Sequence, residues 1–480
     1  MLNFIPKEIT SILKILTPLE VYVAGGPIRD ALLGRNFKDI DLTVPQGAKE
    51  IAFDVAQKYG DAFIPLDEEE GVYRVAIKGF FLDFSSFRKG TKTIEKDLLL
   101  RDFTINAMAV PLRDFLETSP ANWPIIDPAE GQKDLSRRVV RALGRANFCD
   151  DPLRMLRGYR LAAELGFELE AETRGLVREL HPTLADVSPE RVSTELLALF
   201  SHQAGAIVSL MAEDEILFTI FPELLAAKGV AQPSFHHLDV FGHLLLTLKS
   251  ADAVIKEPER FFGPQALAER VFEGILADQK KQAAVRLAAL FHDIGKPHTF
   301  AIRHRITFYE HDRVGEEIFW QIGRRLRFAR KFIKDVASLI KHHMRPFHLL
   351  REYRAGRLSK RAMRRLLKDV PDYRALFMVA MADSLASAGP DKEEGLEDLL
   401  ASLFWEIYAF EQEIFAKQEQ ERLVTGRDLI EIFGLEPGPL FKELLEAVEE
   451  ARAEGQIKTR DEALSFLTHL IKERYGLHGT

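Results

Sequence analysis

The chain has 480 residues, which is more than one hydrophobic core usually holds and predicts several domains. Its net charge of −8 excludes a uniformly basic nucleic-acid-binding protein, so any RNA contact must use local basic patches. The single cysteine, Cys149, excludes a framework of internal disulfides and favours a reducing, cytoplasmic location. No apolar run reaches the roughly 18 residues that a membrane-spanning helix needs, so we expect no membrane association.

A glycine pair follows the first apolar segment. Gly25 and Gly26 come after residues 21–24, a predicted strand, and before a helix predicted to start near Pro27. Backbone N–H groups at such a turn can meet phosphate oxygens, and Arg29 adds positive charge. By itself, a glycine pair is more often only a turn.

Two aspartates follow a short loop later. Asp39 and Asp41 are two residues apart in a predicted strand, so both side chains point to one face of the sheet. Mg²⁺ prefers a few carboxylates, waters and substrate phosphates as ligands. Asp39 and Asp41 therefore predict a Mg²⁺ site beside the glycine pair.

Joined at this spacing, Gly-Gly-x-x-Arg-Asp-x-Leu-Leu-Gly-Arg and Asp-x-Asp resemble the head of the bacterial class (class II) of tRNA nucleotidyltransferases and poly(A) polymerases. The resemblance implies a polymerase-β-like α/β head with a mixed sheet at residues 1–145. It makes Asp39 and Asp41 the catalytic Mg²⁺ ligands and gives nucleotide-binding roles to Gly25, Gly26 and Arg29. A 3′-hydroxyl would attack the α-phosphate of a nucleotide, and pyrophosphate would leave.

The rest of the head predicts a helix at 49–59 and a hairpin of residues 72–78 and 80–86 that turns at Gly79. Asp83 in this hairpin is a weaker candidate for a third metal ligand. The segment around Arg101, Asp102 and Asn106 resembles the family pattern Arg-Arg-Asp-Phe-Thr-Ile-Asn-Ala, with Leu100 in place of the first arginine. The resemblance implies that these three side chains hold the ribose and the triphosphate oxygens.

An all-α neck is predicted at residues 146–228. We expect Asp151 and Arg154, three apart, to be neighbours on one helix face, where an acceptor and a forked donor could read the edge of a base. The segment resembles the family pattern Glu-Asp-x-x-Arg, which implies base recognition by Asp151 and Arg154 without a nucleic-acid template. Arg157 and Arg160 on the same helix either reach the triphosphate or form surface ion pairs.

Residues 229–390 carry a second constellation. His243, His292, Asp293 and Asp383 resemble the metal ligands of the all-helical HD phosphohydrolases, which implies one or two divalent ions, Ni²⁺, Mg²⁺ or Mn²⁺, that activate water on a phosphoester. Further histidines follow at 311, 342 and 343. A lone buried histidine is usually a satisfied core residue, but burying His292 and Asp293 together without a partner would be costly.

Two basic stretches, at 324–331 and 351–368, suit a phosphate backbone or, equally, solvated helix faces balanced by acids. Residues 391–480 predict a charged helical tail.

The connection at 89–96 is short. Relatives that add a complete CCA end carry a long loop here, so the resemblance favours a CC-adding enzyme that takes tRNA and CTP and leaves the last step to a separate A-adding enzyme. The alternatives are a full CCA-adding enzyme that also uses ATP, a poly(A) polymerase, and an HD phosphohydrolase with an RNA-binding head.

Overall fold

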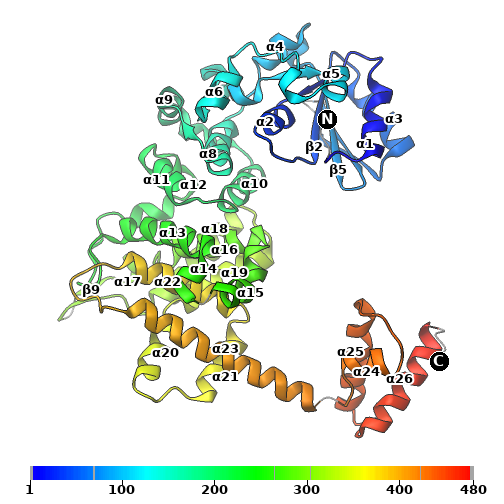
Figure 1. Cartoon of the computed structure of the whole chain (residues 1–480). Coiled ribbons are helices and arrows are strands. Elements are labelled where there is room, and N and C mark those ends of the chain that lie inside the picture. Colours follow the sequence, from blue (N-terminus) through cyan, green and yellow to red (C-terminus); the bar gives the residue numbers. More distant parts are fainter. Residues whose placement is uncertain (1–3, 69–70, 264, 303, 422, 476–480) are drawn as a thin grey trace. The chain divides into compact units, whose positions relative to one another are not determined.

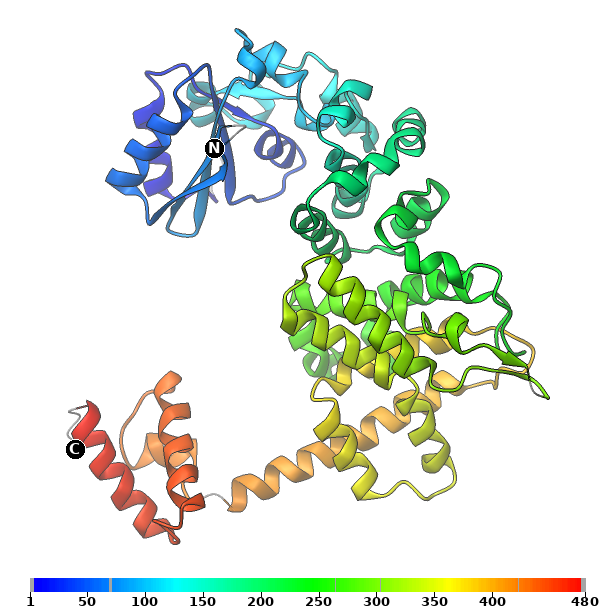
Figure 2. The same cartoon turned by 180° about the vertical axis from the view of Figure 1, so that it is seen from behind.

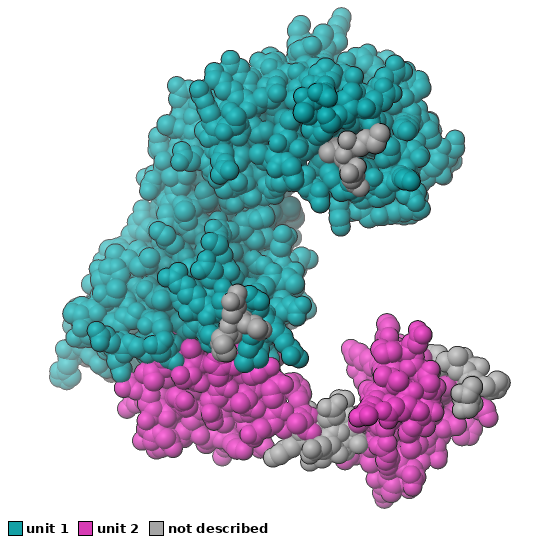
Figure 3. Space-filling view, in the orientation of Figure 1, with its two compact units in different colours: residues 1–347, 372–398 teal, residues 348–371, 399–480 magenta. Residues whose placement is uncertain are grey.

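A computed structural model describes residues 4–68, 71–263, 265–302, 304–421 and 423–475. The chain forms two compact units, coloured separately in Figure 3. The first comprises residues 1–347 and 372–398, and the second comprises residues 348–371 and 399–480. The predicted four-domain division at 145, 228 and 390 stays a prediction.

The head is built on a six-stranded mixed sheet in the order β3-β4-β5-β2-β1-β6 (Figure 1). Its strands are β1 (Tyr22–Ala24), β2 (Asp39–Val44), β3 (Ala62–Asp67), β4 (Val72–Ile77), β5 (Phe80–Ser86) and β6 (Ala109–Pro111). Its helices are α1 (Lys7–Leu16), α2 (Gly26–Leu32), α3 (Ala48–Tyr59), α4 (Ile94–Leu98), α5 (Leu112–Glu117) and α6 (Gly131–Arg137). The predicted mixed-sheet head is confirmed.

The predicted hairpin is also present. β4 and β5 alternate buried and half-buried residues, so the apolar residues of both strands enter the core under α3, which packs on them. Lys78 and Gly79 at the turn both have positive φ, as a two-residue hairpin loop requires. β2 runs parallel to β5 and places Asp41 directly beside Asp83.

The neck is helical, as predicted, apart from β8 (Glu168–Leu169), which pairs with β7 (Val139–Val140). Its helices are α7 (Arg145–Asp150), α8 (Leu153–Leu165), α9 (Ala171–Leu180), α10 (Pro189–Phe200), α11 (Gly205–Glu213) and α12 (Ile216–Ile220). Buried residues on α8 and α10 form the core that joins these two helices.

The region after the neck is a helical bundle with one small strand pair, β9 (Ala301–Ile302) and β10 (Ile306–Thr307). Its helices are α13 (Val240–Lys256), α14 (Pro258–Phe262), α15 (Gln265–Leu276), α16 (Gln279–Phe291), α17 (Lys296–Thr299), α18 (His311–Arg325), α19 (Arg330–His342) and α22 (Tyr373–Ala386). The end of α16 and most of α22 are buried on all sides, so their polar side chains face other protein groups and not water.

The second unit contains a terminal subdomain with its own small core. The remaining helices are α20 (Arg345–Arg354), α21 (Lys360–Asp369), α23 (Leu396–Glu421), α24 (Gly426–Glu431), α25 (Pro439–Ala453) and α26 (Arg460–Tyr475). Apolar residues of the last three helices, such as Leu429, Val448 and Leu467, pack together. The predicted helical tail is confirmed, and Figure 2 shows it from behind. Among the described residues, no helix is both long and apolar enough to cross a bilayer.

Candidate active site and metal cluster

A cleft of about 610 Å³ lies beside the sheet of the head and reaches α8 of the neck. Every nucleotidyl-transfer residue predicted from the sequence lines it, except Asp151. The functional side chains and glycines at its wall are Gly25, Gly26, Arg29, Asp39, Asp41, Asp83, Arg88, Arg101, Asp102, Asn106, Arg154, Arg157 and Arg160.

Three carboxylates meet at the acidic face of this cleft. Asp39 is exposed, whereas Asp41 lies deeper, two residues further along β2. Burial raises the pKa of Asp41 to about 6; Arg101 opposes the shift, and the charges of Asp83 and Asp39 add to it. Burial also raises the pKa of Asp39. The negative charges therefore repel one another in the absence of a cation, which is the environment that a divalent metal relieves.

Asp83 is not free to act as a ligand in the way Asp39 and Asp41 are. Its two oxygens accept hydrogen bonds of 2.8 and 2.7 Å from Arg74, a forked arginine–carboxylate pair. The same guanidinium lies 3.9 Å from Asp39. Arg74 therefore compensates the outer carboxylates, and the predicted extra ligand Asp83 is occupied by this pair.

At Gly25 the backbone passes close to both Asp41 and Arg101. Its φ is +78°, and a Cβ built there would lie 2.7 Å from Nη1 of Arg101 and 3.3 Å from Oδ2 of Asp41. Its N–H donates to the carbonyl of Met108. The position requires glycine for its backbone conformation and also for the space around it.

We therefore expect Gly25→Ala to displace Arg101 or Asp41 and lower kcat by about 100-fold, the usual scale for a misplacement of about 1 Å. Gly34→Ala is the matched control, because Gly34 has a φ of +69° but no neighbouring atom within 4 Å of its Cβ position. Steady-state incorporation of labelled nucleotide measures both. Equal losses in the two variants would show that backbone strain alone, and not crowding at the site, explains the effect.

Arg101 and Asp102 begin a buried polar wall. Burial lowers the pKa of Arg101 to about 10, still well above neutral pH, so its charge is retained. One of its Nη atoms donates to Thr43 at 2.9 Å, while its Nε is buried with no hydrogen-bond partner among the described residues. Asn106 donates to Asp102 and accepts from Arg29 at 2.8 Å. This network fixes the arginines toward the cleft.

The arginines of α8 extend this wall. Arg154 donates to the carbonyls of Leu100 and Arg101 at 2.9 and 3.1 Å, which ties the neck to the head. Arg157 lies 3.3 Å from Asp102. Burial opposes ionisation of Asp102, but the charge of Arg157 and the hydrogen bond from Asn106 hold its pKa at about 2. Asp102 therefore stays charged and positions Arg157.

Glu195 on α10 is a positioning group that the sequence did not reveal. It lies 3.7 Å from Arg157 and 2.7 Å from Arg160, which also pairs with Glu164 at 2.5 Å. Arg157 and Arg160 thus form ion pairs and also line the cleft, and their contact with a triphosphate stays a prediction.

Asp151 is placed differently from the prediction. The expectation that it shares a helix with Arg154 is wrong, since α7 ends at Asp150 and Asp151 is extended, with φ −144° and ψ 97°. A residue before proline is driven out of the helical region, and Pro152 follows here. Its carboxylate accepts from Arg191 at 2.8 Å and from the N–H of Leu153. Asp150 pairs with Lys89 at 2.5 Å.

The helical bundle contains the second cluster, completely separate in sequence from the cleft. His243, His292 and Asp383 form one group of ligand atoms, and Asp293, His311 and His343 form another; in each group the atoms lie within 4.8 Å of one another. His243 Nε2 is 2.9 Å from Asp383, and His292 Nε2 is 3.1 Å from Asp293. All four predicted residues are thus brought together.

His311 and His343 complete the cluster and were not among the predicted ligands. Their Nε2 atoms are 3.2 Å apart, and His311 is 3.3 Å from Asp293. Their Nδ1 atoms lie 2.7 Å from the carbonyls of Phe308 and Ile340. These contacts orient Nε2 toward the cluster, as backbone carbonyls do for the histidine ligands of metal sites. Imidazole and carboxylate donors at these separations fit divalent cations.

The comparisons with known proteins agree with this architecture. The poly A polymerase head domain matches residues 21–141, an RNA and SrmB-binding site of polymerase A matches 166–228, the HD domain matches 241–387, and a tRNA nucleotidyltransferase domain 2 matches 392–467. The A-adding tRNA nucleotidyltransferase of Deinococcus radiodurans is 35% identical over 95% of this chain and 96% of its own length. The chain belongs to the bacterial class II tRNA nucleotidyltransferases with an HD domain.

Members of this family with different products resemble the chain. The CC-adding tRNA nucleotidyltransferase of Thermus thermophilus is 31% identical over 94% of each chain. A solved tRNA nucleotidyltransferase complexed with a primer tRNA and an incoming ATP analog has a TM-score of 0.58 and 22% identity, and it covers 84% of this chain and 99% of that one. At that identity the structural likeness shows the fold of the family.

Proposed function

We propose that the chain extends the 3′ end of tRNA without a nucleic-acid template, using nucleoside triphosphates and releasing pyrophosphate in the cytoplasm. The observation that carries this is one cleft lined by Asp39 and Asp41 and by a wall of arginines, of which Arg29 and Arg101 are buried. Such a wall suits a triphosphate, and the carboxylates suit the metal that accompanies it.

Asp39 and Asp41 would hold Mg²⁺, which when bound neutralises phosphate charge and lowers the pKa of an attacking hydroxyl. The chain's own groups do the rest. Gly25 and Gly26 would let the triphosphate approach the backbone, and Arg29, Arg101 and Asn106, which line the cleft, would hold its oxygens and the ribose. Asp102 pairs with Arg157 and would hold it in position at the cleft.

Base selection falls to Arg154, with Asp151 as its partner. For Asp151 to take part, its carboxylate must leave Arg191, a pair whose arginine side chain is about half exposed at 52%. Exposed pairs cost little to break. The proposal therefore requires Asp151 to move when a nucleotide binds.

CC addition is the product we favour. The connection after β5 is short and held at its base: Arg88 N and Nη1 donate to Asp97 at 2.8 and 3.0 Å, and Lys89 pairs with Asp150. α4 begins at Ile94, so Thr91, Lys92 and Thr93 alone separate it from the short helical turn Arg88–Gly90. This geometry supports a short, anchored connection that cannot move as a long flexible loop would. CC addition also requires a separate A-adding enzyme as a partner.

A-addition is the second candidate, because the Deinococcus radiodurans relative is an A-adding enzyme. Three tRNA transcripts distinguish them: one ending before CCA, one ending in C and one ending in CC, each incubated with Mg²⁺ and labelled CTP or ATP. We expect CTP incorporation on the first two and none of either nucleotide on the third. ATP incorporation on the third alone would make this an A-adding enzyme, and sequential addition of C, C and A would make it a full CCA enzyme.

We also propose that the HD cluster binds one or two divalent metals, Ni²⁺, Mn²⁺ or Mg²⁺, and hydrolyses a phosphoester. The two groups of three ligand atoms support it, since they share one buried centre through the contacts of Asp293 with His292 and His311. The metal would activate water there. Lys296, 2.5 Å from Asp293, adds a cation at the cluster that suits a phosphate.

A further inference from the structure

The helical hairpin formed by α18 and α19 is far more basic than the chain that carries it. Residues 320–342 contain one acid, Asp335, in a protein whose net charge is −8. The cations of this stretch are Arg324, Arg325, Arg327, Arg330, Lys331, Lys334 and Lys341. A local excess of this size creates a positive potential at the surface, which attracts acids or an anionic ligand.

Neighbouring acids neutralise only part of it. Arg325 pairs with Glu223 at 2.8 Å, Arg327 lies 3.7 Å from Glu190, and Lys341 is 2.7 Å from Glu316. Among the residues that the structure describes, no acid pairs with the other four cations. These are Arg324, Arg330, Lys331 and Lys334, all of them exposed.

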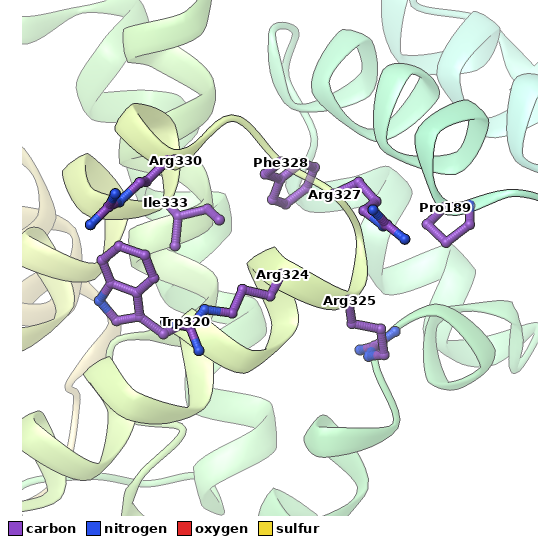
Figure 4. Close-up of a pocket in the computed structure, with 8 residues that line it drawn as sticks. All are labelled: Pro189, Trp320, Arg324, Arg325, Arg327, Phe328, Arg330 and Ile333. Atoms are coloured by element: carbon purple, nitrogen blue, oxygen red, sulfur yellow. The ribbon is translucent and has the colours of Figure 1, made fainter.

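The four cations surround Trp320, which is half-buried on α18. Arg324 lies over its ring, 5.6 Å from the ring centroid. Trp320 and Arg330 line two hollows. The first, of about 840 Å³, continues past Arg324 to Pro189 (Figure 4). The second, of about 670 Å³, continues along Lys331 and Lys334. The cations therefore line one concave surface and are not scattered.

The two helices that carry the surface are closely packed. A Cβ on Gly323 would lie 2.7 Å from the side chain of Ile333, so α18 and α19 are in close contact there. Phe328 is buried in the turn between them, and Arg327 adopts a positive φ of 56° to make that turn. The backbone that carries these cations is therefore already in place, and only side chains have to become ordered when a polyanion binds.

We infer that the α18–α19 surface, formed by Trp320, Arg324, Arg330, Lys331 and Lys334, binds the sugar–phosphate backbone of the tRNA substrate. Both hollows are open and flanked by point charges, which suits a chain of phosphates better than an enclosed small molecule. Trp320 lines both hollows, and aromatic side chains are common where proteins contact RNA. The inference rests on the proposed function, because it takes tRNA as the ligand.

The test removes the four cations together, as Arg324→Ser, Arg330→Ser, Lys331→Ser and Lys334→Ser in the full chain. Binding of fluorescently labelled tRNA lacking its 3′ end is measured by anisotropy at several salt concentrations, without nucleotide. We expect Kd to rise roughly tenfold or more at 0.1 M salt and the slope of log K against log salt to become shallower by about three. With CTP added, KM for tRNA should rise while kcat at saturating tRNA stays the same.

The matched control removes four exposed lysines of the head that lie outside the cleft, Lys7, Lys14, Lys49 and Lys58, and should leave the salt slope unchanged. The double variant Arg324→Lys and Arg330→Lys keeps the charges and should keep the affinity. If the four-cation variant binds tRNA like the wild type, the surface serves another partner, such as an acidic protein, and the inference is overturned. Because the binding assay contains no nucleotide, a chain that binds tRNA but fails to extend it contradicts the proposed function and not this surface.

Discussion

Asp41→Asn should abolish nucleotide incorporation, with a fall in kcat of at least about 1000-fold. Asp41 is the deeper of the two adjacent carboxylates, and the amide keeps its shape while removing the charge that a divalent cation needs. Labelled CTP and tRNA lacking its 3′ end provide the measurement. Retention of more than a tenth of the activity would contradict the role given to Asp41.

The same variant should be more stable than the wild type in metal-free buffer. Because burial raises the pKa of Asp41 to about 6, the folded state disfavours its charged form, whereas the unfolded chain has the ordinary value of 3.8. The free energy of folding therefore carries a penalty of up to about 3 kcal/mol above pH 6, which fades as the pH falls toward 4 and both states become protonated.

Thermal unfolding in EDTA at pH 7.5 and pH 4.5 checks the sign. Asp41→Asn should have the higher Tm at pH 7.5, and the difference should shrink at pH 4.5. Added Mg²⁺ should raise the Tm of the wild type more than that of the variant, since the metal relieves the same repulsion. A variant that is less stable at pH 7.5 would show that its inactivity reflects lost structure and not lost chemistry.

The acidic face of the cleft was predictable because it depends on local periodicity. Two aspartates two residues apart in a strand must share a face, and the structure places both on β2. The pairing of Arg74 with Asp83 was also within reach of the sequence, since a two-residue turn at Lys78 and Gly79 fixes these residues as cross-strand partners. The hairpin was predicted, but the pairing of Arg74 with Asp83 that its register implies was not.

The position of Asp151 shows a different kind of error. Spacing alone placed it on the helix of Arg154, although the proline that follows it disfavours a helical conformation at that residue. Its partner Arg191 lies on α10, 40 residues further along the chain, and no local sequence pattern predicts a contact over that separation. The sequence shows that residues 311 and 343 are histidines, but it does not show that the packing of α18 and α19 brings both close to Asp293.

Asp293→Asn should impair the HD cluster and leave the nucleotide cleft working. Asp293 contacts members of both ligand groups, His292 at 3.1 Å and His311 at 3.3 Å, so removing its charge weakens both. We expect bound metal after dialysis against Ni²⁺ or Mn²⁺ to fall from one or two equivalents to almost none. Hydrolysis of p-nitrophenyl phosphate or a cyclic nucleotide should fall at least about 100-fold.

CTP incorporation by Asp293→Asn should stay within about twofold of the wild type, because none of the residues that line the nucleotide cleft belongs to this cluster. Asp335→Asn, an exposed acid on α19 outside the cluster, is the matched control and should change neither metal content nor hydrolysis. Unchanged metal content in Asp293→Asn would refute the cluster as a metal site. Loss of hydrolysis in Asp41→Asn together with loss of incorporation in Asp293→Asn would mean that the two centres do not work independently.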